Sequence, residues 1–428
     1  MNIVLITNTY APHVGGVARS VEAFRNAYRS RGHRVLVVAP SFPEMPEAEE
    51  DVVRLPALQN FNASDFSVAL PLPVGLRRRL EAFAPDVIHS QHPFLLGTTA
   101  LRLARTFKRP LLFTHHTLYE RYTHYVPGDS EAMKCFIIEL ATCYANLADR
   151  VLAPSESIRD ILLDRGVTTP VSVVPTGVDV ERFASGDGAG MRRRLTIDPD
   201  AHVVGHLGRL APEKNIAFLT RAVCDFLAGD ARRVFLVIGD GEAADELKGI
   251  VSHRGLTGQL RLTGTLEGRH LVDALAASDV FAFASSSETQ GMVLTEAMAA
   301  GLPVVALDAS GVREVVRDHV NGRLLPSDAT EAAFAGTLGE LSKLPPKERS
   351  RLVRGARSTA ADYAMDRCAD KALAAYRRLH LRSEGDYSAG DDLWDQVRLR
   401  ISAELDILRT LNSAGSEAVG AAGREDID

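Results

Sequence analysis

Two glutamates, Glu288 and Glu296, lie at the start of a helical segment late in the sequence, with seven residues between them. We expect Glu288 to project from the loop before the helix, and Glu296 to lie about two turns further on. Carboxylates accept hydrogen bonds from sugar hydroxyls, and the backbone N–H groups of residues 290–293 would favour an anion. The two carboxylates can therefore do different jobs. A capping role for Glu288 is the alternative.

Two cations, Arg209 and Lys214, follow the apolar run 203–207. This run has the character of a buried parallel strand, and ligands of open α/β sheets bind at the carboxyl ends of such strands. Arg209 offers a planar fork and Lys214 a point charge, so together they could hold a diphosphate and neutralise its charge as it departs. Solvated surface cations are the alternative.

A pair of glycines, Gly15 and Gly16, follows the first apolar run and precedes a helical segment. Adjacent glycines at a helix N-terminus let the backbone approach a ligand and direct N–H groups at negative charge, which makes the loop a candidate phosphate or sugar contact. The spacing matches neither G-x-G-x-x-G nor a P-loop, which disfavours a dehydrogenase or an ATPase. A purely structural turn is the alternative.

These candidates are carried by alternating apolar runs and helical segments, the pattern of parallel βαβ units. Helices are expected between the strands, for example at Asn215–Leu227 and Leu271–Ser278. The predicted strands are Asn2–Thr7, Arg34–Ala39, Asp86–Ser90, Pro110–His115, Arg150–Ala153, Val171–Val174, Val203–Leu207, Val234–Ile238, Leu260–Thr263, Val280–Ala284 and Pro303–Leu307. Two doubly wound domains in tandem explain this series most economically.

The boundary between the domains is predicted in residues 175–179, where a proline and a glycine follow a strand. A hinge at this point would let two Rossmann-like domains close on a ligand in a cleft. We assign residues 1–176 to an N-terminal acceptor domain and 177–365 to a C-terminal donor domain. A helix over 366–380 is expected to return toward the N-terminal domain, followed by an extension over 381–428.

The extension is predicted to contain a Gly/Ser/Asp-rich linker at Ser383–Asp392, an amphipathic helix of about 20 residues, and a small, acidic, disordered tail from about Ser413. The apolar residues of the helix recur every three or four positions: Trp394, Val397, Ile401, Leu405, Leu408 and Leu411. We expect this apolar face to dock on the body or on a second subunit in a homo-oligomer. Contact with a membrane surface is the alternative, although acids accompany the arginines of the polar face.

The composition is that of a soluble globular chain, with 428 residues, 46% hydrophobic and 24% charged. A net charge of −6 gives no reason to expect nucleic-acid binding. The four cysteines lack C-x-x-C spacing, so we expect reduced thiols and neither zinc nor disulfides. Neither a secretion signal nor a membrane-spanning apolar run is evident, which indicates a cytoplasmic protein.

Together, Glu288, Glu296 and Gly291, preceded by Arg209 and Lys214, resemble glycosyltransferase family 4. The resemblance covers about residues 1–380. Further matching segments are Gly15-Gly16, 85–89, 115–117, 174–179 and 296–304. It implies the GT-B fold, a nucleotide diphosphate sugar as donor, and retention of the anomeric configuration.

The resemblance also implies residue roles. Glu288 would contact the hydroxyls of the donor sugar and Glu296 the ribose. His116, rather than His115, matches a histidine beside the transferring sugar, because it directly precedes Thr117. The diphosphate would be held by Arg209 and Lys214, helped by backbone groups over Gln290, Gly291, Met292 and Val293 and by the loop of Gly15 and Gly16.

The mechanism implied by the family has no clearly established enzyme nucleophile: the leaving phosphate takes the acceptor proton, and attack occurs on the same face. The sequence offers neither a pair of carboxylates in the glycosidase arrangement nor a D-x-D element after a strand. This interpretation requires no metal and no cofactor beyond the donor.

Acceptor choice is expected to reside in the first domain, in Gln59–Pro73 and in the segment 117–127. The second segment is similar to one in the diacylglycerol glucosyltransferases of this family, which favours UDP-glucose and a lipid glycerol acceptor. The acceptor-side candidates are Tyr119, Arg121, Tyr122 and Tyr125. The run Arg77, Arg78 and Arg79 could touch anionic lipid heads at the inner membrane face, accept a phosphorylated or carboxylated small molecule, or form a solvated helix face.

Two other interpretations remain open. One is a transferase that uses GDP-mannose or another UDP-sugar and makes a soluble glycoside or a polysaccharide. The second is a non-catalytic sugar-nucleotide-binding or assembly protein. Intact Arg209, Lys214, Glu288 and Glu296 argue against a degenerate site.

Overall fold

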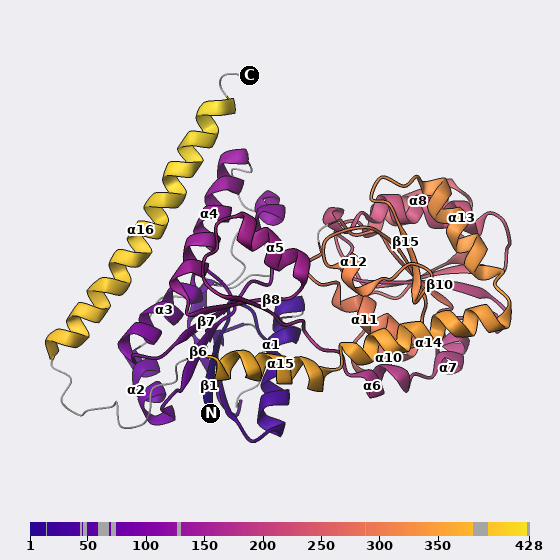
Figure 1. The fold of residues 1–428 in the computed structure, drawn as a ribbon. Coiled ribbons are helices and arrows are strands. Elements are labelled where there is room, and N and C mark those ends of the chain that lie inside the picture. Colours follow the sequence, from indigo (N-terminus) through magenta and orange to yellow (C-terminus); the bar gives the residue numbers. More distant parts are fainter. Residues whose placement is uncertain are drawn as a thin grey trace. The chain divides into compact units, whose positions relative to one another are not determined.

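The computed structural model describes residues 1–428 except 14, 43–44, 46–48, 59–67, 70–73, 126–129, 287, 380–392 and 426–428; some further side chains inside helices and strands are also not described. The chain forms two compact units (Figure 1). The first comprises Met1–Thr176 with Cys368–Asp428, and the second comprises Gly177–Arg367.

The first unit is built on a parallel sheet in which the strand order reverses beside β1. In spatial order the strands are β3 (Val52–Leu55), β2 (Arg34–Pro40), β1 (Asn2–Ile6), β6 (Val87–Ser90), β7 (Leu111–Thr114), β8 (Arg150–Ala153) and β9 (Val171–Val173). An antiparallel pair, β4 (Ala57–Leu58) with β5 (Val68–Ala69), forms a separate two-stranded sheet. The reversal between β1 and β6 makes the carboxyl ends of these two strands the expected ligand-binding edge.

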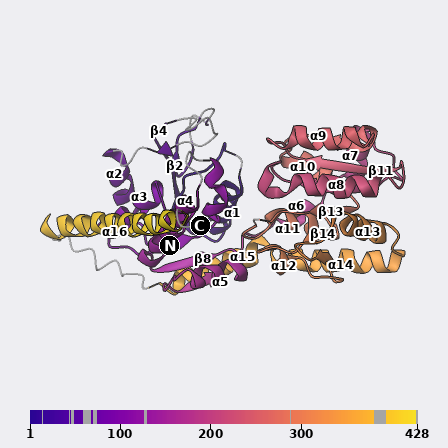
Figure 2. The same ribbon diagram turned by 90° about the horizontal axis from the view of Figure 1, so that it is seen from above.

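Helices cover both faces of the first sheet, as Figures 1 and 2 show. They are α1 (Gly16–Ser30), α2 (Val74–Phe83), α3 (Leu96–Thr106), α4 (Glu131–Leu147), α5 (Glu156–Asp164) and α15 (Met365–Arg377), with the 3-10 helix η2 (Tyr119–Tyr125) after β7. Val4 and Ile6 of β1 share a buried cluster with α2, α3, α4 and α5. On the other face, Tyr28 of α1 and Tyr376 of α15 pack edge to face. Residues of each strand contribute alternately to the two faces, because successive side chains of a strand point to opposite sides of the sheet.

The second unit repeats the doubly wound arrangement. Its parallel strands, in spatial order, are β12 (Leu260–Leu262), β11 (Arg233–Ile238), β10 (His202–Leu207), β13 (Val280–Phe283), β14 (Val304–Leu307) and β15 (Gly322–Leu325). The helices are α6 (Val180–Ala184), α7 (Gly188–Arg194), α8 (Ile216–Leu227), α9 (Ala244–His253), α10 (Gly268–Ala276), α11 (Met292–Ala299), α12 (Val312–Val315), α13 (Glu331–Ser342) and α14 (Pro346–Asp362), with short 3-10 turns η3 (Pro212–Lys214) and η4 (Thr257–Gln259). Alternate strand residues enter two buried clusters, one with Val203 and the other with Val204.

The predicted fold class is confirmed, and every predicted strand is present to within one or two residues at each end. Two edge strands were not predicted. The sequence of β3, Val-Val-Arg-Leu, is short and carries a charge, and β15 begins with glycine, so neither shows the apolar run of a strand buried on both faces. All four cysteines are free, as expected.

The C-terminal helix α16 (Leu393–Glu425) corrects the prediction for the extension. It runs for 33 residues, well past Ser413, where the sequence predicted a disordered tail. Alanine has the highest helix propensity, and the alanines of residues 414–422 support this continuation. Figure 1 shows the helix lying along one side of the first unit, beside α3 and α4. The predicted linker at Ser383–Asp392 lies outside the described residues, as do the side chains of Trp394 and Val397.

The helix docks on α3 and α4 with a different face from the predicted one. Small residues are buried, among them Ala403, Thr410 and Ala414, whereas Leu405 and Leu408 of the predicted apolar face are exposed. Polar contacts explain the orientation. Arg102 of α3 binds Glu404 through two hydrogen bonds of 2.6 and 3.0 Å, and Ser413 donates to Glu139 of α4 at 2.6 Å. None of the helices that the structure describes combines the length and apolar character needed to cross a bilayer.

Candidate donor and acceptor sites

The cationic loop and the glutamate loop of the second unit are brought together by its sheet. Strands β10 and β13 pair in parallel at the point where the strand order reverses, so the loops after them leave the same edge side by side. Asn215 links the loops, because its Nδ2 donates to the carbonyl of Ala284 at 3.3 Å. Asn215 also has a left-handed backbone, with φ of 56°, which ends the 3-10 turn η3 and starts α8.

Lys214 and Glu288 form an ion pair at this edge. The Nζ of Lys214 donates to Oε1 of Glu288 at 2.6 Å, and the two side chains are 19% and 14% exposed. Their charges are therefore partly shielded from solvent. The attraction between them is stronger in this environment than it would be in bulk water. The pair places one cation and one carboxylate next to each other at this edge of the sheet.

Arg209 lies in the same loop and remains accessible. Its Nη2 donates to Oε1 of Glu213 at 2.5 Å, and the Arg209 side chain is 49% exposed while that of Glu213 is 6% exposed. A nearly buried carboxylate thus orients a guanidinium whose outer edge can still meet an anion. Glu213 was not singled out in the sequence, although its spacing of four from Arg209 is typical of an ion pair.

The loop of residues 288–291 leads into α11 as predicted. Gly291 is the N-cap residue, with φ of 74° and ψ of 55°, and α11 has no side-chain cap. The carboxylate of Glu288, in the loop before the helix, binds Lys214. The first-turn N–H groups that follow, including those of Met292 and Val293, lie at the positive end of the helix dipole.

Two further donor-site candidates are buried. Glu296 lies on α11 with 8% exposure, and Gln290 is 4% exposed. The loop after β14 packs against Gln290: Gly311 has φ of 74°, and a Cβ there would lie 2.7 Å from the Gln290 backbone nitrogen. The backbone at Gln290 is thus held in place by a neighbouring loop that needs glycine.

Sequence reasoning missed the loop after β11, which supports the cationic loop. Gly239 and Gly241 have φ of 144° and 150°, and a side chain at either would collide with the carbonyl of Gly208 or of Leu210. The Leu210 N–H donates to the carbonyl of Asp240 at 2.9 Å. A Gly-Asp-Gly triplet directly after a strand was the available signal.

His206 of β10, also missed, is buried below the ion pair. Burial is the main cause that lowers the pKa of His206 to about 4; the charge of Lys214 acts in the same direction, and the hydrogen bond to the backbone of Ala282 opposes it. The neutral ring donates from Nδ1 to the carbonyl of Ala282 at 3.1 Å. This side chain ties β10 to β13 beneath the two loops.

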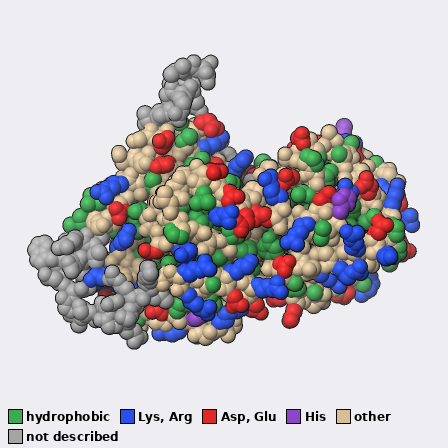
Figure 3. Space-filling view, in the orientation of Figure 1, with side chains coloured by type: hydrophobic (Ala, Val, Ile, Leu, Met, Phe, Trp, Pro, Cys, Tyr) green, Lys and Arg blue, Asp and Glu red, His purple; other side chains and the backbone are tan. Residues whose placement is uncertain are grey.

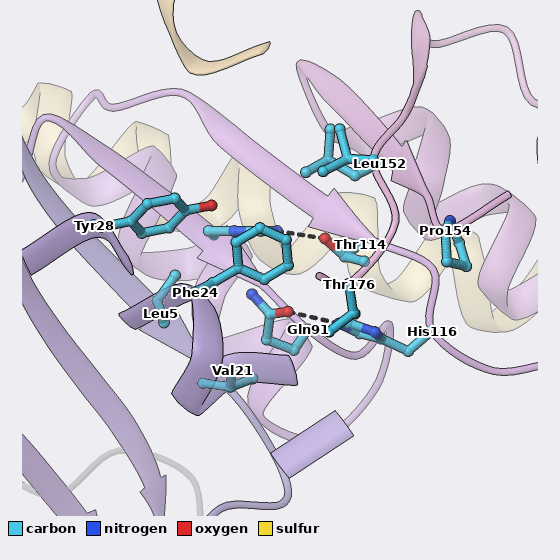
Figure 4. A pocket seen from close by; sticks show the side chains of 12 residues that line it. Leu5, Val21, Phe24, Tyr28, Gln91, Thr114, His116, Leu152, Pro154 and Thr176 are labelled. Carbon is cyan, nitrogen blue, oxygen red and sulfur yellow. Dashed lines mark hydrogen bonds between the residues drawn. The ribbon is translucent and has the colours of Figure 1, made fainter. Parts of the chain in front are cut away.

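In the first unit, His116 follows β7 and lines a small pocket (Figure 4). Its Nε2 is 2.7 Å from Oε1 of Gln91, and the two side chains point toward each other in Figure 4. Burial lowers the pKa of His116 to about 4, so the ring is neutral near pH 7. A neutral ring that donates from Nε2 leaves Nδ1 as an acceptor.

The same pocket contains a second histidine that sequence reasoning missed. His89 is hydrogen-bonded to Thr114 through Nε2 and to Tyr376 through Nδ1, each at 2.7 Å. Burial lowers the pKa of His89 well below its ordinary value. Tyr376 comes from α15, so a helix distant in sequence holds the ring of this pocket-lining histidine in place.

His115, which directly precedes His116, points into the core. It is 1% exposed and packs edge to face against Phe113 and Tyr119. Neither of its ring nitrogens has a hydrogen-bond partner among the described residues, and burial lowers its pKa to about 3. His116 is therefore the member of the pair that lines the pocket.

The acceptor-side candidates differ in accessibility. Tyr119 is 9% exposed and packs against Phe94, so it supports the segment and does not project from it. Arg121 is exposed and Tyr122 is partly exposed. The side chain of Tyr125 and the loop 59–67 lie outside the described residues.

The two remaining candidate regions are on α1 and α2. Gly15 is the N-cap of α1 without a side-chain cap, and a Cβ at Gly16 would meet open space. On α2, Leu76 and Leu80 are buried, while Arg78 and Arg79 are exposed and Arg77 pairs with Glu81 at 2.8 Å. Thus α2 docks by its leucines and presents its arginines to solvent. Within the described ranges, no three His, Cys, Asp or Glu side chains gather as metal ligands would.

Comparison with known structures places the fold in the GT-B class. The chain is similar to Anabaena HepE, solved in complex with UDP, with a TM-score of 0.70, 20% identity, and coverage of 89% of this chain and 100% of HepE. It is also similar to sucrose-phosphate synthase from Thermosynechococcus elongatus, with a TM-score of 0.72, 19% identity, and coverage of 88% and 98%.

Family profiles and curated relatives give the family. The profile of Glycosyltransferase Family 4 matches residues 14–182, and that of Glycosyl transferases group 1 matches 189–359. A GDP-mannose-dependent alpha-mannosyltransferase of Mycobacterium tuberculosis is 30% identical over 390 residues, covering 89% of this chain and 98% of the relative. An alpha-monoglucosyldiacylglycerol synthase of Streptococcus pneumoniae is 29% identical over 333 residues, covering 76% and 75%.

The chain therefore belongs to glycosyltransferase family 4. It is a hexosyltransferase that uses a nucleotide sugar, and retention of the anomeric configuration is typical of its family. The interpretation as a non-catalytic binding protein is set aside.

Proposed function

We propose that this enzyme transfers glucose from UDP-glucose to a hydroxyl of a glycerolipid of the diacylglycerol type. The observation that carries the proposal is the Lys214–Glu288 ion pair beside Arg209 at the carboxyl edge of the second sheet. Support for the lipid acceptor comes from the relatives of Streptococcus pneumoniae and Acholeplasma laidlawii, both named alpha-monoglucosyldiacylglycerol synthase. The similarity of segment 117–127 to diacylglycerol glucosyltransferases agrees with it.

The proposed donor site assigns each residue a task that suits its chemistry. Arg209 and Lys214 hold the diphosphate, and the N–H groups over 290–293, at the start of α11, add the positive end of a helix dipole. Glu288 accepts hydrogen bonds from the sugar hydroxyls, and Glu296 from the ribose. Because Lys214 is already paired with Glu288, a bound diphosphate shares this cation with the carboxylate that orients the sugar.

The proposed chemistry needs no nucleophile from the enzyme. The acceptor hydroxyl attacks the anomeric carbon on the face that the diphosphate leaves, and a phosphate oxygen takes the proton. Arg209 and Lys214 stabilise the negative charge that grows on the leaving group. His116, neutral near pH 7, acts as a hydrogen-bonding group whose orientation Gln91 fixes. Gly15 and Gly16 remain a proposed phosphate contact.

The first unit is proposed to bind the acceptor through Arg121 and Tyr122, and to touch anionic lipid heads through Arg78 and Arg79. Both arginines are exposed on a helix whose leucines are buried, so the contact is electrostatic and peripheral. Basic and acidic side chains are interspersed on the face drawn in Figure 3. The proposed contact therefore depends on the local cluster of Arg78 and Arg79. We propose that the enzyme lies at the inner face of the membrane only during the reaction.

A second candidate donor is GDP-mannose. The specific observation that favours it is the alignment with the Mycobacterium tuberculosis mannosyltransferase, which covers 98% of that relative at 30% identity. A mannosyltransferase would use the same cations and carboxylates, because the diphosphate and the sugar hydroxyls are common to both donors.

A donor panel separates these possibilities. Thermal unfolding is recorded with UDP-glucose, UDP-galactose, GDP-mannose and GDP-glucose, since a ligand that binds the folded state raises the midpoint. Each donor is then incubated with vesicles that contain diacylglycerol and with soluble acceptors. The proposal expects the largest midpoint shift and lipid glucosylation with UDP-glucose. A shift and turnover confined to GDP-mannose would replace it by the second candidate.

A further inference from the structure

Helix α16 leaves an apolar stripe uncovered. Ile401, Leu405, Leu408 and Leu411 are 54%, 46%, 60% and 44% exposed, and they account for most of the large exposed hydrophobic side chains found in the described residues. Ile401, Leu405 and Leu408 are spaced by four and then three positions, so they share one side of the helix. The opposite side is the one docked on α3 and α4. A soluble surface rarely keeps such a continuous stripe without a partner.

The stripe has the sequence of a coiled-coil seam. If Ile401 and Leu408 occupy d positions of a heptad, then Leu405 and Asn412 occupy the a positions. The buried residues Ala403, Thr410 and Ala414 then fall at f, f and c, on the far side of the helix. The docked face and the seam lie on different sides of the helix. Helix α16 can therefore stay packed on α3 and α4 of its own chain while its other side binds a second helix.

The charges beside the stripe complement those of an identical, parallel helix. In the same register Glu404 is at g and Arg409 is at e. In a parallel coiled coil, the g residue of one helix lies next to the e residue of the other helix whose number is five higher. Glu404 is 52% exposed although it binds Arg102, and Arg409 is 78% exposed. Asn412 at an a position is the kind of polar residue that fixes register and a two-stranded state.

A lipid surface fits the same stripe less well. Residues 393–425 carry four arginines and five carboxylates, so the helix has no excess of positive charge for anionic headgroups. Glu404 borders the stripe directly. The occupant that matches both the heptad spacing and the paired charges is a second copy of this chain.

The geometry points to a homodimer in which α16 pairs in parallel with α16 of a second chain through Ile401, Leu405 and Leu408. Each first unit then lies on the outer side of its own helix, away from the seam. The seam spans fewer than two heptads, so we expect weak association, with a dissociation constant on the order of micromolar. This inference is independent of the proposed donor and acceptor.

Sedimentation velocity of the full chain from about 1 to 100 μM, a range that brackets micromolar affinity, tests the pairing. The double variant Leu405→Glu/Leu408→Glu keeps good helix formers and should weaken dimerisation at least about 100-fold, as removal of two central contacts does. The matched control is Leu163→Glu, which changes a leucine of α5 that is 50% exposed. Its sedimentation should equal that of the wild type, and circular dichroism should show all three proteins folded.

Disulfide trapping tests the direction of pairing. In the parallel register, Asn412 faces its own counterpart, so Asn412→Cys should give a covalent dimer under mild oxidation, at a yield well above that of the wild type with its four native cysteines. A wild-type chain that stays monomeric throughout the range would overturn the inference. So would a monomer that floats with phosphatidylcholine–phosphatidylglycerol vesicles and loses flotation in the Leu405→Glu/Leu408→Glu variant, because that result assigns the stripe to lipid.

Discussion

Replacing Glu288 by glutamine should lower kcat at least about 100-fold, equivalent to about 2.7 kcal/mol of transition-state stabilisation. The amide keeps the size of the side chain and removes its charge. Glu288 is 14% exposed and its partner Lys214 is 19% exposed, so bulk water screens their interaction only partly. Hydrogen bonds to charged groups contribute about 1.5–3 kcal/mol, and the sugar hydroxyls would lose one or two of them.

The assay is steady-state glucosyl transfer from UDP-glucose to diacylglycerol vesicles, together with calorimetric titration of UDP. Because Glu288 contacts the sugar in this account and the diphosphate is held by the cations, Glu288→Gln should change the UDP dissociation constant less than about threefold while kcat falls. Glu331→Gln is the control. Glu331 forms another ion pair of the second unit, at 2.5 Å from Arg221 of α8. Removing its charge should leave kcat unchanged. A folded Glu288→Gln enzyme with kcat within threefold of the wild type would refute the assignment.

Three further outcomes follow from the same contacts. Lys214→Met should weaken UDP binding by about 10-fold or more, measured by calorimetry, since it removes a cation from the diphosphate; equal affinity would argue for binding elsewhere. Gly239→Ala should lower the free energy of unfolding by more than about 2 kcal/mol in urea titrations, because φ is 144° and a Cβ would collide with Gly208; a change below about 0.5 kcal/mol would contradict this packing. The pKa of His115 falls from an ordinary 6.5 to about 3 on folding, so the unfolded chain binds more protons between these values and stability declines as pH drops from 6.5 toward 3. His115→Phe should flatten that decline in thermal scans, and a wild-type midpoint that does not change between pH 7 and 5 would show that the ring is not held neutral.

The architecture was predictable because each buried strand is an apolar run of a recognisable length. The alternation of such runs with helical segments gave both doubly wound sheets, and the same logic failed at β3 and β15, where edge strands mix apolar residues with Arg54 or begin with Gly322. Edge strands are covered on fewer sides, so their sequences carry less of the signal.

The candidate site was predictable only where motif residues follow strands. Lys214 and Glu288 are 74 positions apart in the sequence, and their contact depends on the parallel pairing of β10 with β13. The support from Gly239 and the hydrogen bond between His89 and Tyr376 could not be foreseen, because they depend on how distant segments pack. Helix α16 shows the converse: its apolar periodicity was visible, but ion pairs and small residues decided which face docks.

The central claim is that the carboxyl edge of the second sheet holds the nucleotide sugar, and a crystal structure of the full chain grown with UDP tests it most directly. The account predicts diphosphate oxygens within about 3 Å of Arg209 and Lys214, ribose hydroxyls on Glu296, and the diphosphate facing the N-terminus of α11. UDP bound at any other position, with these side chains unchanged and away from the nucleotide, would contradict it.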